Sequence, residues 1–409
     1  MLPSALENSL RRGAWRKPIS SAHPGEIAWQ QARETAGAIV ELGPEELVPL
    51  ADCDHRVLAR DHLALVDLPS FDNSAMDGWA VNGMGPWKVT HEIVAGQFPD
   101  WELGVNEASS IATGAPIPRG TTGIIRSEYG TLKGSQLTSL QPPTSDIRRV
   151  AEECRTGDLM LTAGSRLTPS AIGLLAATGH DSLWVRVKPR AHVLVFGDEL
   201  IFDGLPQPGK IRDSLGPQLS GWISRLGAVI TEISHCPDSL PDVIDIMSTI
   251  NAEIVITTGG TAAGPRDLLR SALAHFNATI HVDGVHVRPG HPMMLACIPR
   301  LDSHAIPLIG LPGNPLSAIV GLLTLAQPLI YTALGVPLPP LEKLTTHSDL
   351  YTKDGTRLVA GVAHSGAFMV SEFNGSAMLR GLSHSNGFAV IDKDAKAGEI
   401  VNYLPLPHN

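Results

Sequence analysis

The sequence has few cysteines, no long basic run and no secretion signal, and each absence excludes a class of protein. Its four cysteines, Cys53, Cys154, Cys236 and Cys297, are far apart and form no CxxC pair. A disulfide framework or a zinc knuckle is therefore not expected. The cysteine pattern fits a protein located in a reducing cytoplasm. The net charge is −10, so nucleic acid is not an expected partner. The N-terminal "MLPSALENSLRRGAWRK" lacks the apolar core of a signal peptide.

Only one long apolar run is present, "LSAIVGLLTLAQPLIYTALG", from Leu316 to Gly335. Gln327 and Pro328 interrupt it, and a "PGNP" turn precedes it. These interruptions favour a buried core helix over a membrane span. We therefore expect a soluble, cytoplasmic protein with no membrane partner.

The first half of the chain predicts a β domain inserted into a mixed helical domain. "GEIAWQQARETAGAIV" is typical of a helix, and short strand-like runs broken by Gly and Pro follow from about residue 62 to 141. "LTPSAIGLLAATG" then predicts a second helix, with Thr168 as N-cap, Pro169 in the first turn and Gly179 as the stop. The expected domains are a discontinuous mixed helical domain at 22–62 and 147–187, and the inserted β domain at 63–146.

The second half alternates strands with helices. "AHVLVF", "AVITEIS", "EIVITT" and "IPLIG" are apolar runs separated by helical segments such as "SLPDVIDIMSTIN". This order predicts a parallel, doubly wound α/β domain, which we place at 188–337. A Pro-rich linker, "GVPLPPLEKL", then leads into a C-terminal β domain at 338–409.

Polar, glycine-bearing turns follow three of the predicted strands, at the edge where open α/β sheets bind ligands. The first exit is "FGDEL", with Asp198 and Glu199, and the third is "TTGGTAAGPRDLL", in which Pro265, Arg266 and Asp267 open a helix. The fourth is "GLPGNPLSA", ahead of a helix that we expect to be capped near Ser317. Glycines allow close approach to a ligand, and helix N-termini offer unpaired N–H groups, so a phosphate-bearing ligand is expected.

Two further segments each have a structural and a functional interpretation. "HVRPGHP", residues 286–292, is either a surface turn or an anion contact through Arg288 and His291. "SFDNSAMDGWAV", residues 70–81, contains turn-forming residues, and read alone it favours a turn. The alternative is that Asp77, just before Gly78, is presented to a ligand.

The segments "FDNSAMDGWAV", "ATGAPIP", "RLTPSAIGLLAATG", "GDEL", "TTGG…RD", "RPGHP" and "GLPGNPLSA" occur in this order over most of the chain. Together they resemble the molybdopterin molybdenumtransferase family, MoeA and the gephyrin E-domain, over about residues 24–400. The resemblance implies a multidomain α/β plus β fold. Its parts are a central doubly wound domain like MogA and MoaB, an inserted β domain, a mixed linker domain and a C-terminal small β-barrel.

The resemblance also implies a reaction and an assembly. The family inserts molybdenum from molybdate into adenylylated molybdopterin, with Mg²⁺ and release of AMP. It works as a homodimer whose site lies between the β block of one subunit and the α/β domain of the other. Molybdoenzymes or other cofactor-biosynthesis proteins are implied partners.

Matching by motif transfers specific roles to this chain. The implied catalytic residues are Asp77, Glu199, Asp213 and Asp267, of which Asp77, Glu199 and Asp267 suit the metal. The implied substrate-binding residues are Thr113, Thr258, Gly259, Gly260, Thr261, Arg266, Arg288, His291, Pro312, Pro315, Arg357 and Ser376.

The sequence also departs from the family pattern. Gly284 replaces a lysine, Arg288 and His291 stand where two lysines are usual, Leu215 replaces an asparagine, and Phe196 replaces a hydroxyl residue. Because Arg and Lys bind anions with different geometry, these changes leave other hypotheses open. One is a paralogue that binds molybdopterin as a carrier without catalysis; others are a dimeric scaffold and an adenylyltransferase-like enzyme. The choice of molybdate or tungstate also stays open.

Overall fold

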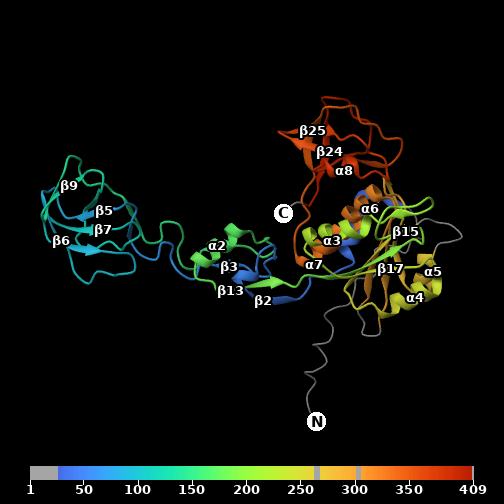
Figure 1. Ribbon diagram of the computed structural model, residues 1–409, viewed down its shortest axis with the longest axis horizontal. Helices are drawn as coiled ribbons and strands as arrows, with labels where there is room; N and C mark the ends of the chain where they lie inside the picture. Colours follow the sequence, from blue (N-terminus) through green and yellow to red (C-terminus); the bar gives the residue numbers. More distant parts are fainter. Residues whose placement is uncertain (1–25, 262–267, 301–304, 408–409) are drawn as a thin grey trace, which may run out of the picture. The chain divides into compact units, whose positions relative to one another are not determined.

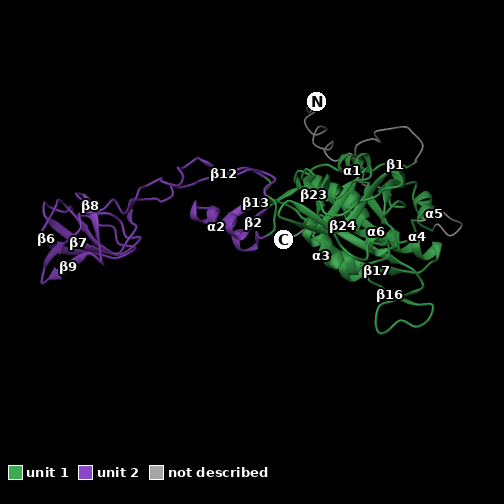
Figure 2. Cartoon of the chain, turned by 90° about the horizontal axis from the view of Figure 1, so that it is seen from above, with its two compact units in different colours: residues 1–46, 55–59, 184–409 green, residues 47–54, 60–183 purple. Residues whose placement is uncertain are grey.

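The computed structural model describes residues 26–261, 268–300 and 305–407 (Figure 1). By its internal contacts the chain divides into two compact units. Unit 1 contains residues 1–46, 55–59 and 184–409, and unit 2 contains residues 47–54 and 60–183 (Figure 2).

A six-stranded sheet forms the centre of unit 1, in the order β17-β14-β18-β22-β21-β19. Its first four strands run parallel: β17 (Val229–Cys236), β14 (Arg190–Phe196), β18 (Ile254–Thr258) and β22 (Ile306–Leu311). These are the four strands expected from the apolar runs, within one or two residues at each end. The predicted doubly wound α/β domain is confirmed.

Two further strands make this sheet mixed rather than wholly parallel, which corrects the expectation. β21 (Met294–Ile298) pairs antiparallel with β22, and β19 (Thr279–Asp283) pairs antiparallel with β21. The connection from β21 to β22 is too short to carry a crossover helix, and a short connection permits only antiparallel pairing.

Helices cover both faces of the sheet. On one face, α4 (Leu240–Thr249) and α5 (Leu268–His275) pack against side chains such as Leu194 and Val255. On the other face, α3 (Leu215–Leu226), α6 (Pro315–Gly321), η2 (Leu322–Ala326) and α7 (Gln327–Leu334) pack against Val193 and Ile256. Because adjacent strand residues point to opposite faces, the strands carry almost uninterrupted apolar runs.

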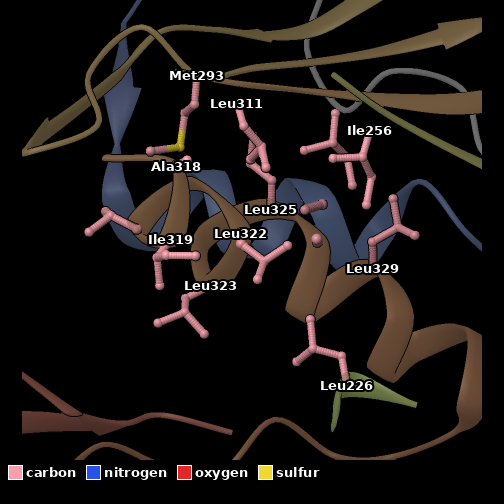
Figure 3. Close-up of a cluster of buried hydrophobic side chains, with 14 of the residues drawn as sticks. Leu226, Ile256, Met293, Leu311, Ala318, Ile319, Leu322, Leu323, Leu325 and Leu329 are labelled. Atoms are coloured by element: carbon pink, nitrogen blue, oxygen red, sulfur yellow. The ribbon is translucent and has the colours of Figure 1, made fainter. Parts of the chain in front are cut away.

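The long apolar run is a core helix, as predicted. Of the described residues, one helical run, Pro315–Leu334, is long and apolar enough to cross a membrane, and 89% of its apolar stretch is buried inside the protein. Its side chains pack with Leu226 of α3, Ile256 of β18 and Leu311 of β22 (Figure 3). The helix begins at Pro315 with Asn314 in the N-cap position, so the expected cap near Ser317 is wrong. Proline favours the first helical turn, where its missing N–H costs nothing.

The predicted N-terminal helix is α1 (Trp29–Ala38), which packs on this core helix. The Trp29 indole donates to Thr324 Oγ1 at 2.9 Å, and Arg33 donates to the Leu323 carbonyl. Leu323 and Thr324 both lie in η2, a π-helical turn. The acceptor of the buried Arg33 guanidinium therefore lies in a π-helical turn, an uncommon local structure.

The C-terminal β domain is a small closed barrel, as predicted. Its strands follow the order β24-β25-β23-β27-β26, and β26 pairs again with β24. They are β23 (Glu342–Thr346), β24 (Thr356–His364), β25 (Ala367–Val370), β26 (Gly387–Ile391) and β27 (Ile400–Pro405), with α8 (Arg380–Ser383) before β26. The sheet is extended through β24 by β20 (Val285–Arg288) and then β1 (Ile27–Ala28).

Unit 2 contains the inserted β block, a six-stranded sheet in the order β8-β5-β7-β6-β10-β9. The strands are β5 (Gly78–Val81), β6 (Trp87–Ile93), β7 (Glu107–Ile111), β8 (Gly123–Arg126), β9 (Gly130–Lys133) and β10 (Gln136–Ser139). Ala80 and Ile124 belong to a core cluster on one face, and Val81 and Ile125 to a cluster on the other.

The rest of unit 2 consists of short elements. α2 (Pro169–Ala177) has Thr168 as its N-cap, whose side chain accepts from the Ala171 N–H, so this predicted cap is confirmed. β3 (His62–Leu63) pairs with β12 (Leu159–Leu161), and β4 (Asn73–Ser74) pairs with β11 (Ile147–Arg148). Other short elements are η1 (Leu50–Asp52) in unit 2, β15 (Leu200–Ile201) and β16 (Ile211–Arg212) in unit 1, and β2 (Glu45–Pro49) and β13 (Ser182–Arg186) at the unit boundary.

Candidate active site

The exits of the parallel strands converge on one pocket of about 390 Å³ in unit 1. β14, β18 and β22 all contribute, which is the convergence expected at the carboxyl ends of parallel strands. The pocket is lined by Phe196, Gly197, Glu199, Leu200, Ile211, Arg212, Asp213, Ser214, Leu215, Asp238, Thr258, Gly259, Gly260, Gly313, Asn314, Pro315 and Ala377.

The turn after β14 presents Glu199 to this pocket. Gly197 has φ +134°, and a Cβ there would lie 2.8 Å from Glu199 Oε2. Only glycine combines that backbone angle with the absence of a side chain. The carboxylate of Glu199 therefore folds back over a glycine, which brings it to the edge of the sheet.

The double glycine after β18 forms the next wall. Gly259 and Gly260 have φ of +86° and +69°, and a Cβ on either would lie 3.7 to 3.9 Å from Phe196. The backbone of this turn consequently approaches the Phe196 side chain. Thr258 lies at the end of β18 and is nearly fully buried.

Asp213 is the cap of helix α3. Its Oδ1 accepts from the backbone N–H groups of Leu215 at 2.9 Å and Gly216 at 3.1 Å, and the residue is only 7% exposed. These are two of the unpaired donors at the start of an α-helix. Asp213 therefore lines the pocket and also accepts hydrogen bonds from the otherwise unpaired N–H groups at the start of α3.

The start of α6 is also satisfied internally, which corrects the expectation of free N–H groups there. The Ser376 carbonyl, from the barrel, accepts from the N–H groups of Leu316 at 3.0 Å and Ser317 at 3.3 Å. Pro315 has no N–H, and Ala318 donates to the Asn314 carbonyl. The first-turn donors of α6 are therefore occupied by protein rather than offered to a phosphate.

The turn that follows Arg288 approaches the start of α6. Arg288 on β20 and Arg357 on β24 are paired in register on adjacent strands, and Arg288 is exposed. Gly290, in the turn after Arg288, approaches α6 so closely that a Cβ would lie 3.3 Å from the Ser317 carbonyl. The "RPGHP" turn and Ser376 thus meet at one helix terminus.

His291 and Gly284 differ from the arginines in their surroundings. His291 Nε2 lies 3.4 Å from Glu26 Oε1, and its Nδ1 lies 3.2 Å from the Val285 carbonyl. Gly284 has φ +93°, and a Cβ there would lie 3.5 Å from Glu26. The positive φ at position 284 disfavours a lysine there. The Glu26 side chain lies next to this position.

The pocket lining is acidic. Among the described residues that line it, Glu199, Asp213 and Asp238 carry carboxylates, and Arg212 is the one cation. Within the described ranges, no group of three or more His, Cys, Asp or Glu side chains is arranged to hold a metal ion. Mg²⁺ is usually held by one or two carboxylates together with substrate phosphates. The donor set therefore suits a magnesium ion that arrives with a phosphorylated ligand.

Unit 2 brings Asp77 and Thr113 together. The Thr113 N–H donates to Asp77 Oδ1 at 2.6 Å, and this bond lowers the pKa of the exposed Asp77 carboxyl. Gly78, which follows, has φ +149°, and a Cβ there would lie 2.0 Å from the Ile125 carbonyl. The Asp-Gly pair therefore has a steric requirement for glycine and leaves an ionised carboxylate at the surface.

The other polar residues of "SFDNSAMDGWAV" stabilise local structure. Asp72 accepts from the Val150 N–H and pairs with Arg149. Ser74 Oγ donates to the Met76 carbonyl, and Asn73 Nδ2 donates to the Phe71 carbonyl. The turn interpretation holds for these three residues, whereas Asp77 has its carboxylate exposed.

The structure groups the predicted site residues into three sets. Glu199, Asp213, Thr258, Gly259, Gly260 and Pro315 line the pocket; Arg288, His291, Arg357 and Ser376 belong to the strands, turn and loop near the start of α6; Asp77 and Thr113 are paired in unit 2. Thr261 and Pro312 are buried and do not line the pocket. Arg266 and Asp267 lie outside the described residues.

Arg212, Asp238 and Ala377 are among the pocket residues that the sequence-based selection did not include. Asp238 lies two residues after the end of β17, so inspecting that strand exit would have found it. Arg212 precedes the selected Asp213. Ala377 comes from the barrel, and no local sequence signal indicates that the barrel contributes to this pocket.

Comparisons with known proteins agree with the resemblance. Three family models match successive regions: the MoeA N-terminal region (domain I and II) at residues 27–179, a probable molybdopterin binding domain at 192–332, and the MoeA C-terminal region (domain IV) at 347–406. A molybdopterin molybdenumtransferase of a Nostoc species is 31% identical, covering 92% of this chain and 93% of the relative. Molybdopterin molybdenumtransferase 2 of Mycobacterium tuberculosis is 32% identical, covering 85% and 91%.

A solved structure supports the fold independently. The molybdopterin biosynthesis MoeA protein from Pyrococcus horikoshii superposes with a TM-score of 0.75 at 23% identity, covering 94% of this chain and 100% of that one. At that identity the likeness concerns the fold alone. On the three family matches and the near full-length relatives, the chain belongs to the molybdopterin molybdenumtransferase (MoeA) family.

Proposed function

We propose that this protein is a molybdenum insertase of molybdenum cofactor biosynthesis. It transfers molybdenum from molybdate to the dithiolene of adenylylated molybdopterin, and AMP is released when the phosphoanhydride bond breaks. The observation that carries the proposal is the pocket at the strand exits, which combines a glycine turn, carboxylates and a neighbouring cationic patch. Family membership over nearly the whole chain supports the same reaction.

In this proposal the pocket holds the phosphate-bearing end of the substrate. The Gly259–Gly260 turn lets backbone approach the terminal phosphate, and Thr258 adds a hydroxyl. Arg266, outside the described residues, supplies charge. Asp213 keeps the start of α3 fixed at the pocket wall through its two N–H contacts.

Magnesium fits the proposed pocket through Glu199, with Asp267 and Asp77 as further carboxylates. When bound, the ion neutralises charge on the anhydride oxygens and so eases departure of AMP. The Asp77 carboxyl is ionised at neutral pH, as an exposed aspartate is, and the Thr113 N–H lowers its pKa further. An ionised, exposed acid is suited to a cation or to orienting water.

Molybdate is a substrate oxyanion and requires several donors together. We assign it to Arg288, Arg357, His291 and the Ser376 hydroxyl, near the start of α6. As the resemblance implies, we also propose a homodimer, in which Asp77 and Thr113 of one subunit serve the substrate bound by the other.

The test supplies the purified chain with adenylylated molybdopterin, Mg²⁺ and molybdate, and measures AMP and active cofactor. We expect both products to appear together and to depend on molybdate. Tight binding of the pterin without AMP or cofactor would contradict the insertase. Complementation of an insertase-deficient strain checks the same function in cells.

A second function, a carrier that binds molybdopterin without turnover, is favoured by one observation. His291 is paired with Glu26, and Gly284 provides no charge, so the cationic patch depends mainly on two arginines. Such a carrier would bind molybdopterin with no dependence on molybdate. The substrate assay above separates the two functions by its molybdate dependence.

A further inference from the structure

The segment between β25 and α8, residues 371–379, is called the barrel loop here because it leaves the C-terminal barrel and reaches the pocket. Ala377 lines the pocket. The preceding carbonyl, that of Ser376, accepts both first-turn N–H groups of α6. One short loop therefore closes a pocket wall and satisfies the helix that forms the neighbouring wall.

The loop is attached to the barrel through the Asn374 carboxamide. β25 ends at Val370, where it pairs with Gly361, so the next residue of β24, Ala360, has no β25 partner. Asn374 takes this place: its Oδ1 accepts from the Ala360 N–H at 2.9 Å, and its Nδ2 donates to the Ala360 carbonyl at 3.2 Å. The side chain thus continues the strand ladder by one rung.

The same amide also fixes the loop's own backbone. Asn374 Nδ2 donates to the Ser371 carbonyl, and the Ser371 N–H donates to the Ala360 carbonyl at 3.1 Å. Ala360 is fully buried. Removing the amide would leave the buried Ala360 N–H without its acceptor and release the loop two residues before Ser376.

We propose that Asn374 is a positioning residue, which holds the barrel loop so that Ser376 and Ala377 complete the pocket. It touches no ligand itself and acts through Ser376. The consequence for molybdate rests on the proposed function, in which the Ser376 hydroxyl contacts the oxyanion. The consequence for the α6 amides does not rest on it.

The experiment compares three full-length variants with the wild-type chain: Asn374→Ala, Asn374→Asp and the control Asn386→Ala. Asp keeps the acceptor for the Ala360 N–H but turns a carboxylate toward two carbonyl oxygens. Asn386 makes the same pair of bonds to Ala363, at 2.7 and 2.9 Å, in the same barrel. Because Asn386 does not line the pocket, its loss reports general loosening of the barrel.

The first measurement is backbone amide hydrogen exchange of Leu316 and Ser317 without ligand. Both Asn374 variants are expected to exchange about tenfold faster there, whereas Asn386→Ala matches the wild type. Unchanged exchange in the Asn374 variants, or the same increase in the control, overturns the proposal.

The second measurement is equilibrium dialysis with molybdate, which requires no turnover. Both Asn374 variants are expected to bind molybdate about tenfold more weakly, and the control as tightly as the wild type. Faster exchange with unchanged molybdate affinity supports the positioning of the loop and contradicts the assignment of Ser376 to the molybdate site. If the variants bind molybdate more weakly but the wild-type chain never releases AMP, the positioning role of Asn374 is supported. The proposed insertase activity is then the only claim that this result contradicts.

Discussion

At the residue scale, most polar side chains near the candidate site have a structural partner, so partners distinguish roles better than residue type does. Asp72 binds a backbone N–H and an arginine, and Asp213 binds two helix N–H groups. Asp77 binds the N–H and the side chain of one residue, Thr113, and remains exposed. This difference makes Asp77 the residue whose change tests function with least risk to the fold.

Asp77→Asn is expected to lower AMP release by about a hundredfold while leaving thermal stability close to that of the wild type. The amide oxygen still accepts from Thr113, but the negative charge is lost, and one catalytic group typically contributes about 10²–10⁴-fold. The measurement is the initial rate of AMP release. Asp72→Asn serves as the control and should lower stability rather than the rate; wild-type turnover in Asp77→Asn would make Asp77 a turn residue only.

Asp213→Ala tests the helix-cap role of the second acid. It removes the acceptor of the Leu215 and Gly216 N–H groups, and loss of a cap costs about 1 kcal/mol in the free energy of unfolding. Urea unfolding of unit 1 measures this cost. Ser214→Ala is the matched control, because the Ser214 side chain makes no capping bond at the N-cap of the same helix. Equal stability of the two variants would contradict the assigned cap.

At the element scale, the long core helix shows how interior burial overrides a membrane-like composition. Its apolar residues face the sheet, α1 and α3 rather than a single partner. The π-helical turn at Leu322–Ala326 also holds the Leu323 carbonyl that accepts from Arg33 of α1.

Leu325→Ala is expected to lower the free energy of unfolding by about 2–5 kcal/mol, the usual cost of a core cavity. Leu325 is fully buried in the core cluster of unit 1. Denaturant unfolding followed by circular dichroism gives the value. Leu205→Ala, at a position 90% exposed, is the control and should change stability little. A similarly small effect at Leu325 would contradict the assignment of this helix to the core.

The barrel contains an acid whose pKa predicts a pH effect. The Ala397 N–H, Lys396 and Tyr351 together lower the pKa of Asp349 to about 2. The unfolded value is about 3.9, so the folded state favours the ionised form. The resulting stabilisation is complete above about pH 4 and is lost as the pH falls toward 2.

The check is urea unfolding of the wild type and Asp349→Asn between pH 2 and pH 6. The stability difference between them should be largest near pH 6 and shrink as Asp349 becomes protonated. Because Asp349 is exposed, the effect is expected to be modest. A difference that grows with acidity would have the wrong sign for this assignment.

At the scale of the whole molecule, the two units have cores of their own. Ile124 belongs to a cluster formed by residues of unit 2, and Leu325 to a cluster of unit 1. Multidomain chains commonly depart from a single two-state transition. Differential scanning calorimetry is therefore expected to resolve more than one transition.

Ile124→Ala should lower the midpoint of one transition, and Leu325→Ala the midpoint of another. Each substitution creates a cavity within one core, so its effect should stay with the unit that contains it. If either variant lowered the midpoint temperatures of all transitions together, the two cores would not unfold independently. The double variant should show both shifts added, since distant sites are usually additive.

The sequence by itself determined the fold class, the main strands and the buried helix. The spacing of apolar residues and the residue types of turns are local properties. Runs such as "AHVLVF" and the cap at Thr168 could therefore be recognised without knowledge of tertiary contacts. The ordered motifs indicated the family, which the comparisons confirm. The antiparallel strands β19 and β21 were missed, because their orientation depends on chain connectivity rather than on pattern.

Only the tertiary structure decided which polar groups of the candidate site are already occupied. Sequence could place the start of α6 near a ligand, but it could not show that the Ser376 carbonyl occupies the α6 amides. Ser376 is far from α6 in the chain, and its position depends on the path of a loop from the barrel. The pairing of a buried donor is a property of the folded neighbourhood, and no single segment of the chain encodes it.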